Sequence, residues 1–199
     1  MSLSYWDYSY AQWLYQYLLA DIGNDYGVAG LLGNIYAESS ICPFRQQDMN
    51  YANSWTLTET FRQNNKNYFV YYDGNTGYSL AQWTTYSRRS NYWDYIGGAS
   101  YVGDGTKSAE FLLHELQTGY SSVYNSLVNA TSIRGASDTV LVNYEAPQDQ
   151  SQAVKDLRAY YSSEVYNDFS GLPPIPPGTG IDILFLKKFF IDRQFRKVI

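Results

Sequence analysis

The sequence predicts a mainly α fold with a small β element. Apolar residues recur at helical spacing in several segments, and the clearest is residues 27–39, where Leu31, Leu32 and Ile35 continue one stripe. Only residues 68–75 show the alternation of a short strand, and they end at an Asp-Gly step that is typical of a tight turn. These two observations favour helices packed around one core, with the β element confined to the middle of the chain.

The order of the elements follows from the apolar periodicity and from the Gly, Pro and Asn residues that interrupt it. A first amphipathic helix carries Trp13, Leu14 and Leu18 and is expected to end near Gly23. Residues 40–79 are expected to be mixed, with a small β-hairpin or irregular strands. The expected helices cover residues 4–21, 26–39, 80–96, 107–118, 120–129, 135–145 and 149–168.

The second helix carries small residues opposite its apolar stripe. Gly30 and Gly33 lie in its interior, where each glycine costs about 1 kcal/mol relative to alanine. We expect that cost to be offset by the close approach of another backbone. The sequence therefore predicts a central helix that is packed on both sides.

Glu38 lies near the end of this helix, three residues after Ile35 and on the edge of the apolar stripe. A carboxylate held against apolar surface loses solvation, and its pKa rises. Such a group can stay protonated near neutral pH and give its proton to a leaving oxygen. The alternative is a glutamate that is solvated or paired with an arginine or lysine.

The C-terminal part of the chain differs from the rest. Residues 1–170 read as one domain, and residues 171–180 form a Pro/Gly-rich, semi-rigid linker. Residues 181–199 are basic and hydrophobic, with five basic and two acidic side chains. They suit an interfacial helix, a docking helix or the truncated start of a second domain, so their contact with a membrane stays open.

Composition limits the partners of the chain. The net charge of the 199 residues is −5, so no global basic field would attract nucleic acid or an anionic cell-wall polymer, and steering must be local, for instance through Arg88 and Arg89. The 22 Tyr and 5 Trp residues supply rings with a polar handle, which suit the apolar faces of sugars. The N-terminus shows neither the basic region nor the cleavage site of a signal peptide.

The sole cysteine, Cys42, excludes an internal disulfide bond. Cys42 and the sole histidine, His114, could form the pair of a Cys–His hydrolase. However, nothing around Cys42 resembles a nucleophile loop, and His114 lies in an amphipathic helical run. One Cys and one His also give no zinc-ligand spacing. We therefore expect no metal and no organic cofactor.

Three runs carry a resemblance to a known family. They are residues 27–48 (GVAGLLGNIYAESSICPFRQQD), residues 77–84 (GYSLAQWT) with a basic segment behind them, and residues 142–147 (VNYEAP). In this order and spacing the chain resembles the phage tail lysozyme family, which is related to goose-type lysozymes and lytic transglycosylases, over about residues 5–170. Two departures are Ser40 and Ser79, where the related patterns have glycine.

The resemblance implies a lysozyme-like two-lobed fold with a central helix that carries the catalytic glutamate. It implies a peptidoglycan glycosidase (muramidase) on a phage or prophage tail, with Glu38 as general acid. Peptidoglycan is then the substrate, other tail proteins are further partners, and the protein acts in the virion tail or at the extracellular cell wall. The residues that would bind substrate are Ser39, Tyr78, Gln82, Trp83, Tyr144 and Glu145.

A second carboxylate decides the type of reaction. Retaining glycosidases hold it about 5–5.5 Å from the acid and inverting ones about 6.5–9.5 Å away. The candidates are Asp48, Glu59, Asp73 and Glu145. Asp73 is the candidate catalytic base, although its Asp-Gly step is also typical of a turn, and Glu145 could instead be ion-paired. Without a second acid the chain would be a lytic transglycosylase. Two further hypotheses are a non-catalytic glycan-binding or structural tail component and a peptide-bond hydrolase.

Overall fold

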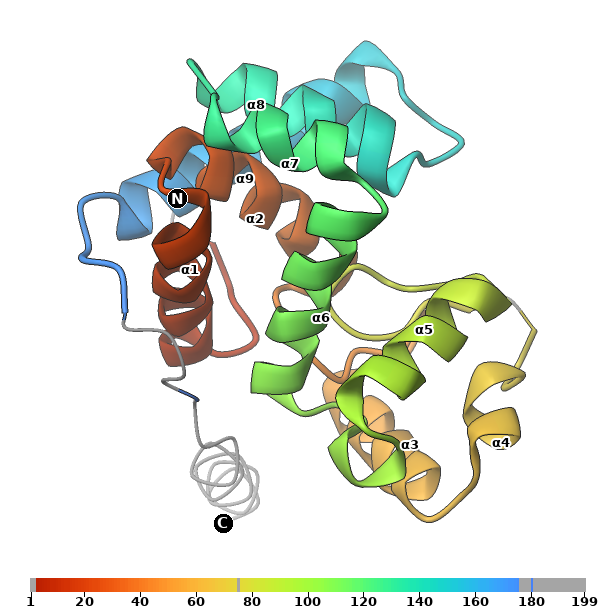
Figure 1. Cartoon of the computed structure of the whole chain (residues 1–199). Helices are drawn as coiled ribbons and strands as arrows, with labels where there is room; N and C mark the ends of the chain where they lie inside the picture. The colour runs from red at the N-terminus through yellow and green to blue at the C-terminus, as the bar shows by residue number, and fades with distance from the viewer. Residues whose placement is uncertain (1–2, 75, 176–179, 181–199) are drawn as a thin grey trace, which may run out of the picture.

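The computed structural model describes residues 3–74, 76–175 and 180, and these residues form a mainly helical protein (Figure 1). The prediction of a mainly α fold is confirmed. The elements are α1 (Tyr8–Ile22), α2 (Asp25–Ser39), α3 (Tyr51–Arg62), α4 (Lys66–Val70), α5 (Tyr86–Ile96), η1 (Ala99–Tyr101), α6 (Gly105–Thr118), α7 (Ser121–Val128), α8 (Ile133–Val140), the π-helix η2 (Leu141–Glu145) and α9 (Gln152–Phe169).

Side-chain caps set the ends of the first two helices. Helix α1 begins four residues later than expected because Asp7 is its N-cap and accepts a hydrogen bond from the Tyr10 amide. It ends at Gly23, whose φ of 67° places it in the left-handed region that glycine adopts without strain. Asn24 then caps α2 by accepting from the amides of Tyr26 and Gly27. The helix that carries Glu38 therefore begins at a strongly defined position.

The predicted β-hairpin at residues 68–75 is wrong. Residues 66–70 form the short helix α4, which buries Phe69 and Val70 in the core. The helix starts here because the Asn65 side chain accepts a hydrogen bond from the Tyr68 amide. Asp73, with a φ of 48°, lies in the turn that follows. In the described residues the β element consists of two isolated antiparallel bridges, which join Gln46 to Tyr78 and Tyr78 to Trp83.

The mixed region also contains a helix that the sequence pattern did not predict. Helix α3 starts at the N-cap Asn50, which accepts from the Asn53 amide, and it buries Leu57 and Phe61 one turn apart. Phe61 makes edge contacts with the rings of Phe69 and Tyr78. These contacts, rather than strand pairing, hold this part of the chain together.

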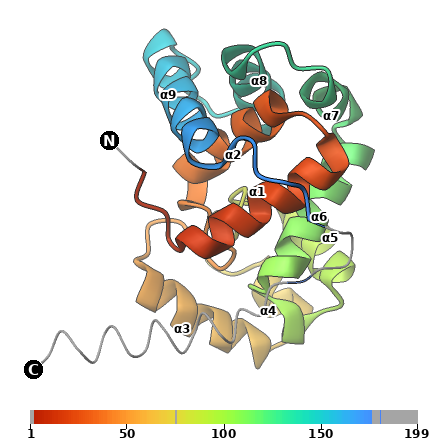
Figure 2. The same cartoon turned by 90° about the vertical axis from the view of Figure 1, so that its left-hand side faces the viewer.

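The helices form two lobes, as the resemblance implied. One lobe gathers α7, α8 and α9 around α2, and the other contains α3, α4 and α5 (Figures 1 and 2). Helix α6 runs between the lobes and packs against α5 in one and α7 in the other. Helix α1 packs against both α2 and α6. The C-terminal end of α2 therefore points toward the region where the two lobes meet.

The glycines of α2 provide the close approach that the sequence predicted. A Cβ atom at Gly30 would lie 2.4 Å from the Ala136 Cβ of α8, and one at Gly33 would lie 2.4 Å from the Ser162 amide nitrogen of α9. Backbone atoms of both partner helices therefore occupy the space that a side chain would need. Helix α2 is central in its lobe because it has almost no side chain on these faces.

Gly33→Ala tests this packing. The added methyl group overlaps backbone atoms of Ser162 that cannot move without shifting α9, so we expect the free energy of unfolding to fall by about 1–3 kcal/mol. Gly119→Ala is the matched control, because its Cβ would lie 3.4 Å from the Glu115 carbonyl oxygen at a right-handed helical φ of −84°. Urea denaturation measures both variants, and equal stability of the two would contradict the packing.

The first residues of the predicted linker, 171–175, contact the helical domain. Gln16 donates a hydrogen bond of 2.8 Å from Nε2 to the Pro173 carbonyl oxygen, and Leu172 and Ile175 pack against the core. The predicted tail element at residues 181–199 lies outside the described residues. Among the helices that the structure describes, none has the length and apolar character needed to cross a membrane.

Candidate active site

Glu38 lies in the last turn of α2 and forms an ion pair with Arg158 of α9. Arg158 Nη2 lies 2.6 Å from Glu38 Oε1, while its Nη1 donates to the Asn34 carbonyl oxygen at 2.9 Å. The Glu38 side chain is 22% exposed and that of Arg158 12%. The carboxyl group is thus largely withdrawn from water, as the stripe predicted. Its immediate neighbour is a guanidinium group, so the glutamate is paired with an arginine.

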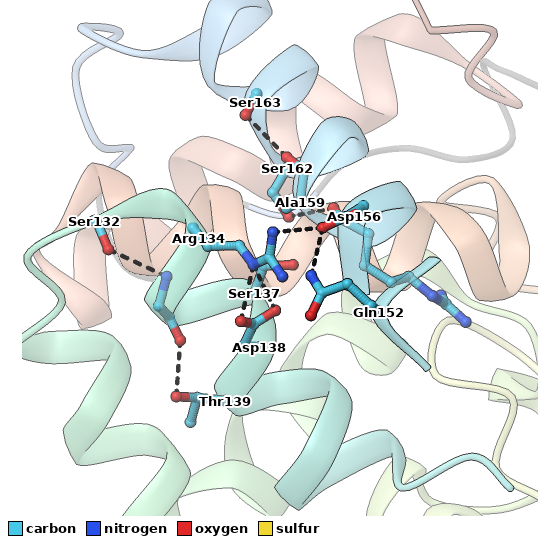
Figure 3. A network of polar contacts seen from close by, with 12 residues as sticks. Ser132, Arg134, Ser137, Asp138, Thr139, Gln152, Asp156, Ala159, Ser162 and Ser163 are labelled. Atoms are coloured by element: carbon cyan, nitrogen blue, oxygen red, sulfur yellow. Dashed lines mark hydrogen bonds and ion pairs between the residues drawn. The ribbon is translucent and has the colours of Figure 1, made fainter. Parts of the chain in front are cut away.

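Arg158 is placed by the packing of α8 and α9 against α2. Arg134 of α8 contacts Asp138 on its own helix and Asp156 on α9 (Figure 3). These pairs are mostly exposed, so they orient the helices more than they stabilise the fold. Ser162 lies directly against Gly33, and its hydroxyl donates to the Arg158 carbonyl oxygen at 2.9 Å and lies 3.4 Å from the Gly30 carbonyl oxygen.

Helix α8 continues as a π-helical turn that carries Tyr144 and Glu145. The Ala146 amide donates to the Leu141 carbonyl oxygen at 2.9 Å, and Ala146 ends the turn with a φ of 45°. A π-helical turn contains one extra residue, which shifts the register of the side chains that follow, and such turns are frequent at functional sites. Here Tyr144 is buried, and Glu145 has one oxygen, Oε1, that is buried with no hydrogen-bond partner among the described residues.

Glu115 of α6 joins the second and third sequence motifs. Its carboxylate accepts from Trp83 Nε1 at 2.9 Å, from Arg88 Nε and Nη2 at 2.8 Å each, and from the Tyr144 hydroxyl at 2.7 Å. All four donors converge on a side chain that is only 10% exposed. The sequence motifs did not single out Glu115, although it follows Phe111 and Leu112 on the apolar face of its helix.

Arg88 and Arg89 are both turned into the protein. Arg89 is fully buried and cannot provide local steering, whereas steering by Arg88, which is 18% exposed, stays a prediction. Arg88 lies 5.0 Å from the centroid of the Tyr144 ring as well as pairing with Glu115. Arg89 is fully buried, donates to the Tyr72 carbonyl oxygen at 3.1 Å and lies over the Phe69 ring. Burial lowers the pKa of Arg89 to about 10. Both guanidinium groups hold the fold of the second motif.

The two serines that replace family glycines adopt the backbone conformation that glycine favours. The φ angles of Ser40 and Ser79 are 55° and 70°, in the left-handed region. Ser40 is the C-cap of α2, two residues after Glu38, and Ser79 is held by a hydrogen bond of 2.7 Å from Oγ to the Pro43 carbonyl oxygen. The departures therefore keep the chain path, and the strain at Ser79 is offset by its side-chain bond.

The remaining residues predicted to bind substrate lie mostly inside. Ser39 is buried and donates to the Ile35 carbonyl oxygen, and the hydroxyls of Tyr78 and Thr58 lie 2.8 Å apart. Gln82 has a φ of 46° and donates from Nε2 to the Ser79 carbonyl oxygen at 2.8 Å. Asp73 is exposed in its turn. Substrate contact by these residues stays a prediction, as does the role of Asp73 as a base.

The charge of Glu38 reaches Glu145. The pKa of Glu145 is raised to about 8, first by burial, then by the negative charge of Glu38 and to a smaller extent by that of Glu115, while Arg88 and Arg158 oppose the rise. Helices α2, α5, α6 and α9 and the π-turn thus bring three carboxyl groups and two guanidinium groups to one place. Carboxyl groups whose surroundings differ in this way are the arrangement used for acid and base catalysis.

The sequence model of the phage tail lysozyme family matches residues 9–169, which include both lobes and all three motifs. The chain belongs to the phage tail lysozyme family. Membership supports a lysozyme-like function on peptidoglycan and fits a location on the phage tail. A search of curated proteins finds no match.

An open cavity of about 640 Å³ lies along α5 and α6 of this phage tail lysozyme domain. Arg88 and Glu115 belong to its lining, together with Tyr95, His114 and Tyr120. The rings of Tyr95 and His114 stack with centroids 4.6 Å apart. The cavity therefore borders the Glu115 network and presents aromatic faces of the kind that suit a sugar ring.

Cys42 lies in the core of the phage tail lysozyme fold. Its side chain is fully buried, and burial raises the pKa of the thiol, which disfavours the reactive thiolate. His114 instead stacks on Tyr95 at the rim of the cavity. The structure thus gives no support to a Cys–His hydrolase. In the part of the chain that is described, no group of His, Cys, Asp and Glu residues has the arrangement of a metal site.

Proposed function

We propose that this chain is a muramidase of a phage or prophage tail, which cleaves the bond between N-acetylmuramic acid and N-acetylglucosamine. Glu38 is its catalytic carboxyl group, and the cleavage aids local penetration of the cell wall. The observation that carries the proposal is the position of Glu38 at the end of α2, beside Arg158 and within the field of Glu145. Family membership supports peptidoglycan as the substrate.

The chemistry that this site can serve is general-acid cleavage of a glycosidic bond. A positioned carboxyl group that protonates the leaving oxygen typically contributes about 10²–10⁴-fold to the rate. A nearby ionised carboxylate stabilises the oxocarbenium-like transition state. The resemblance implies the acid role for Glu38, and Arg158 fixes the orientation of its carboxyl group through the contact of 2.6 Å. Substrate would enter where the two lobes meet.

Two competing functions are compatible with the same fold. A lytic transglycosylase would use the same acid and close an anhydro ring with the 6-hydroxyl of the sugar. A non-catalytic component would bind glycan or stiffen the tail tip and contact other tail proteins. Glu145 Oε1, a buried carboxyl oxygen without a partner among the described residues, favours an enzyme over a pure binding module. A binding module gains nothing from such a group, whose burial costs free energy.

Digestion of purified peptidoglycan by the wild-type protein tests the proposal. Mass spectrometry of the soluble fragments identifies the ends that are released, and we expect reducing N-acetylmuramic acid ends. Anhydro ends would make the protein a lytic transglycosylase, and free amines without new sugar ends would make it a peptidase. A protein that sediments with the cell wall but releases no fragment would support a structural or glycan-binding role.

A further inference from the structure

The open cavity along α5 and α6 has the size and the access of a ligand site. Its volume of about 640 Å³ lies within the range of about 300–1,000 Å³ that small-molecule sites occupy. Helix α5 contributes Asn91 and Tyr95 to the lining, and α6 contributes His114 and Thr118. These four residues are exposed, Tyr95 by 40%, so a ligand can reach them from solvent.

The aromatic rings of the cavity are held in place by contacts within the fold. The rings of Tyr95 and His114 are nearly parallel, with an angle of 26° between their planes. The Tyr95 ring also contacts the buried Phe111 ring, with centroids 5.6 Å apart, and Tyr120 meets Tyr144 edge to face at 4.9 Å. Rings that are already fixed lose little conformational freedom when a ligand packs on them, so binding costs less free energy.

The charged side chains of the lining are paired. Arg88 and Glu115 are 2.8 Å apart, and Asp94 lies 2.6 Å from Lys66 of α4. These two ion pairs carry no net charge, so they give an anionic ligand, such as a wall phosphate, no advantage over a neutral one. The cavity therefore favours a ligand without charge.

The polar groups of the lining suit a neutral ligand that carries an amide. The Asn91 side chain has two N–H donors and one carbonyl acceptor. Thr118 donates from its hydroxyl to the His114 carbonyl oxygen at 2.7 Å, which leaves its own oxygen able to accept. An N-acetylated sugar combines an apolar C–H face, which suits the rings, with an acetamido group that both donates and accepts.

We propose that this cavity is a second glycan-binding site, which holds an N-acetylated sugar unit of peptidoglycan without cleaving it. This inference rests on the proposed muramidase function and adds a site of substrate retention to it. Glu38 does not belong to the lining, so a sugar held here is not placed for cleavage. Glu115 borders the cavity and also binds the Tyr144 hydroxyl of the π-turn, so the site adjoins the network behind the proposed catalytic group.

His114 allows a direct test because it is the sole histidine of the chain. The probe is the trisaccharide of β-1,4-linked N-acetylglucosamine, added to Glu38→Gln protein so that the ligand is not cleaved. We expect the ring signals of His114 in NMR spectra to shift and to saturate. Cellotriose, which lacks the acetamido groups, should bind about 10-fold more weakly. Unchanged His114 signals, or equal binding of the two sugars, would overturn the inference.

Two substitutions locate the binding at the cavity. Tyr95→Ala removes a ring and Asn91→Ala removes an amide, and we expect each to weaken trisaccharide binding by about 2–10-fold. Tyr101→Ala is the matched control, because Tyr101 is 46% exposed and lies outside the lining. Circular dichroism checks that all three variants are folded. If neither cavity variant binds more weakly than Tyr101→Ala, the sugar binds elsewhere and the inference fails.

Peptidoglycan cleavage separates the inference from the proposed function. We expect Tyr95→Ala to raise the apparent KM and to keep kcat, because the cavity would contribute binding that the ground state and the transition state share. If the wild type cleaves peptidoglycan but the trisaccharide leaves the His114 signals unchanged, the inference fails while the function stands. If the trisaccharide binds beside His114 but the wild type releases no fragment, the function fails and the glycan site stands.

Discussion

Glu115→Ala is expected to lower the free energy of unfolding by about 3–5 kcal/mol, because it removes one partner of a buried ion pair. The substitution leaves the Arg88 guanidinium, only 18% exposed, without its carboxylate. It also takes the acceptor from Trp83 Nε1 and from the Tyr144 hydroxyl, both of which are buried. A buried donor that loses its acceptor costs about 1–3 kcal/mol. The substitution therefore removes every hydrogen bond of the Glu115 network rather than a single one.

Urea denaturation of Glu115→Ala measures this loss, and Glu110→Ala on the same helix is its control. Glu110 pairs with Lys107 where both side chains are about one third exposed, so its removal should change stability by less than about 1 kcal/mol. The double variant of Glu115→Ala with Arg88→Ala should lose less than the two single losses together, because the unpaired charge is then absent. Strict additivity would show that the two side chains are not coupled.

The sequence predicted the centre of the molecule well because its signals are local. The apolar stripe of residues 27–39 and the two interior glycines are read from neighbouring positions, and they located α2, its close packing and Glu38. The same rule applied to Phe111, Leu112 and Glu115 would have found a carboxylate on an apolar helix face. Glu115 was missed because the run around it was interpreted only as the helix that carries His114.

The features that the sequence did not reveal depend on contacts between residues that lie far apart in the chain. Arg158 lies 120 residues after Glu38 in the chain, and only the packing of α9 on α2 brings them together. The π-turn that buries one oxygen of Glu145 is another feature without a periodic signal. Near residues 68–75 the alternation favoured strands, but the cap at Asn65 and the burial of Phe69 made a helix more stable. In each case tertiary contacts overrode the local preference.

Glu38→Gln has the largest expected effect on activity. Glutamine keeps the size of the side chain and an oxygen that can still accept from Arg158 Nη2, so the fold and the position of α9 should be retained. Glutamine can neither carry the negative charge of an ionised carboxylate nor donate the proton of a carboxylic acid. The substitution therefore disables the site whether Glu38 donates a proton or stabilises the transition state. We expect peptidoglycan cleavage to slow by about 10²–10⁴-fold.

Release of soluble muropeptides, measured at equal protein concentration and followed by mass spectrometry, gives this rate. Glu110→Gln controls for the loss of a carboxylate elsewhere, and co-sedimentation with the cell wall shows whether the Glu38 variant still binds substrate. A variant that binds normally but does not cleave places the defect in the chemical step, because binding and transition-state stabilisation are then separated. Full cleavage by a folded Glu38→Gln protein would remove Glu38 from the mechanism and leave Glu145, the one carboxyl group of this cluster without an ion-pair partner, as the group to replace next.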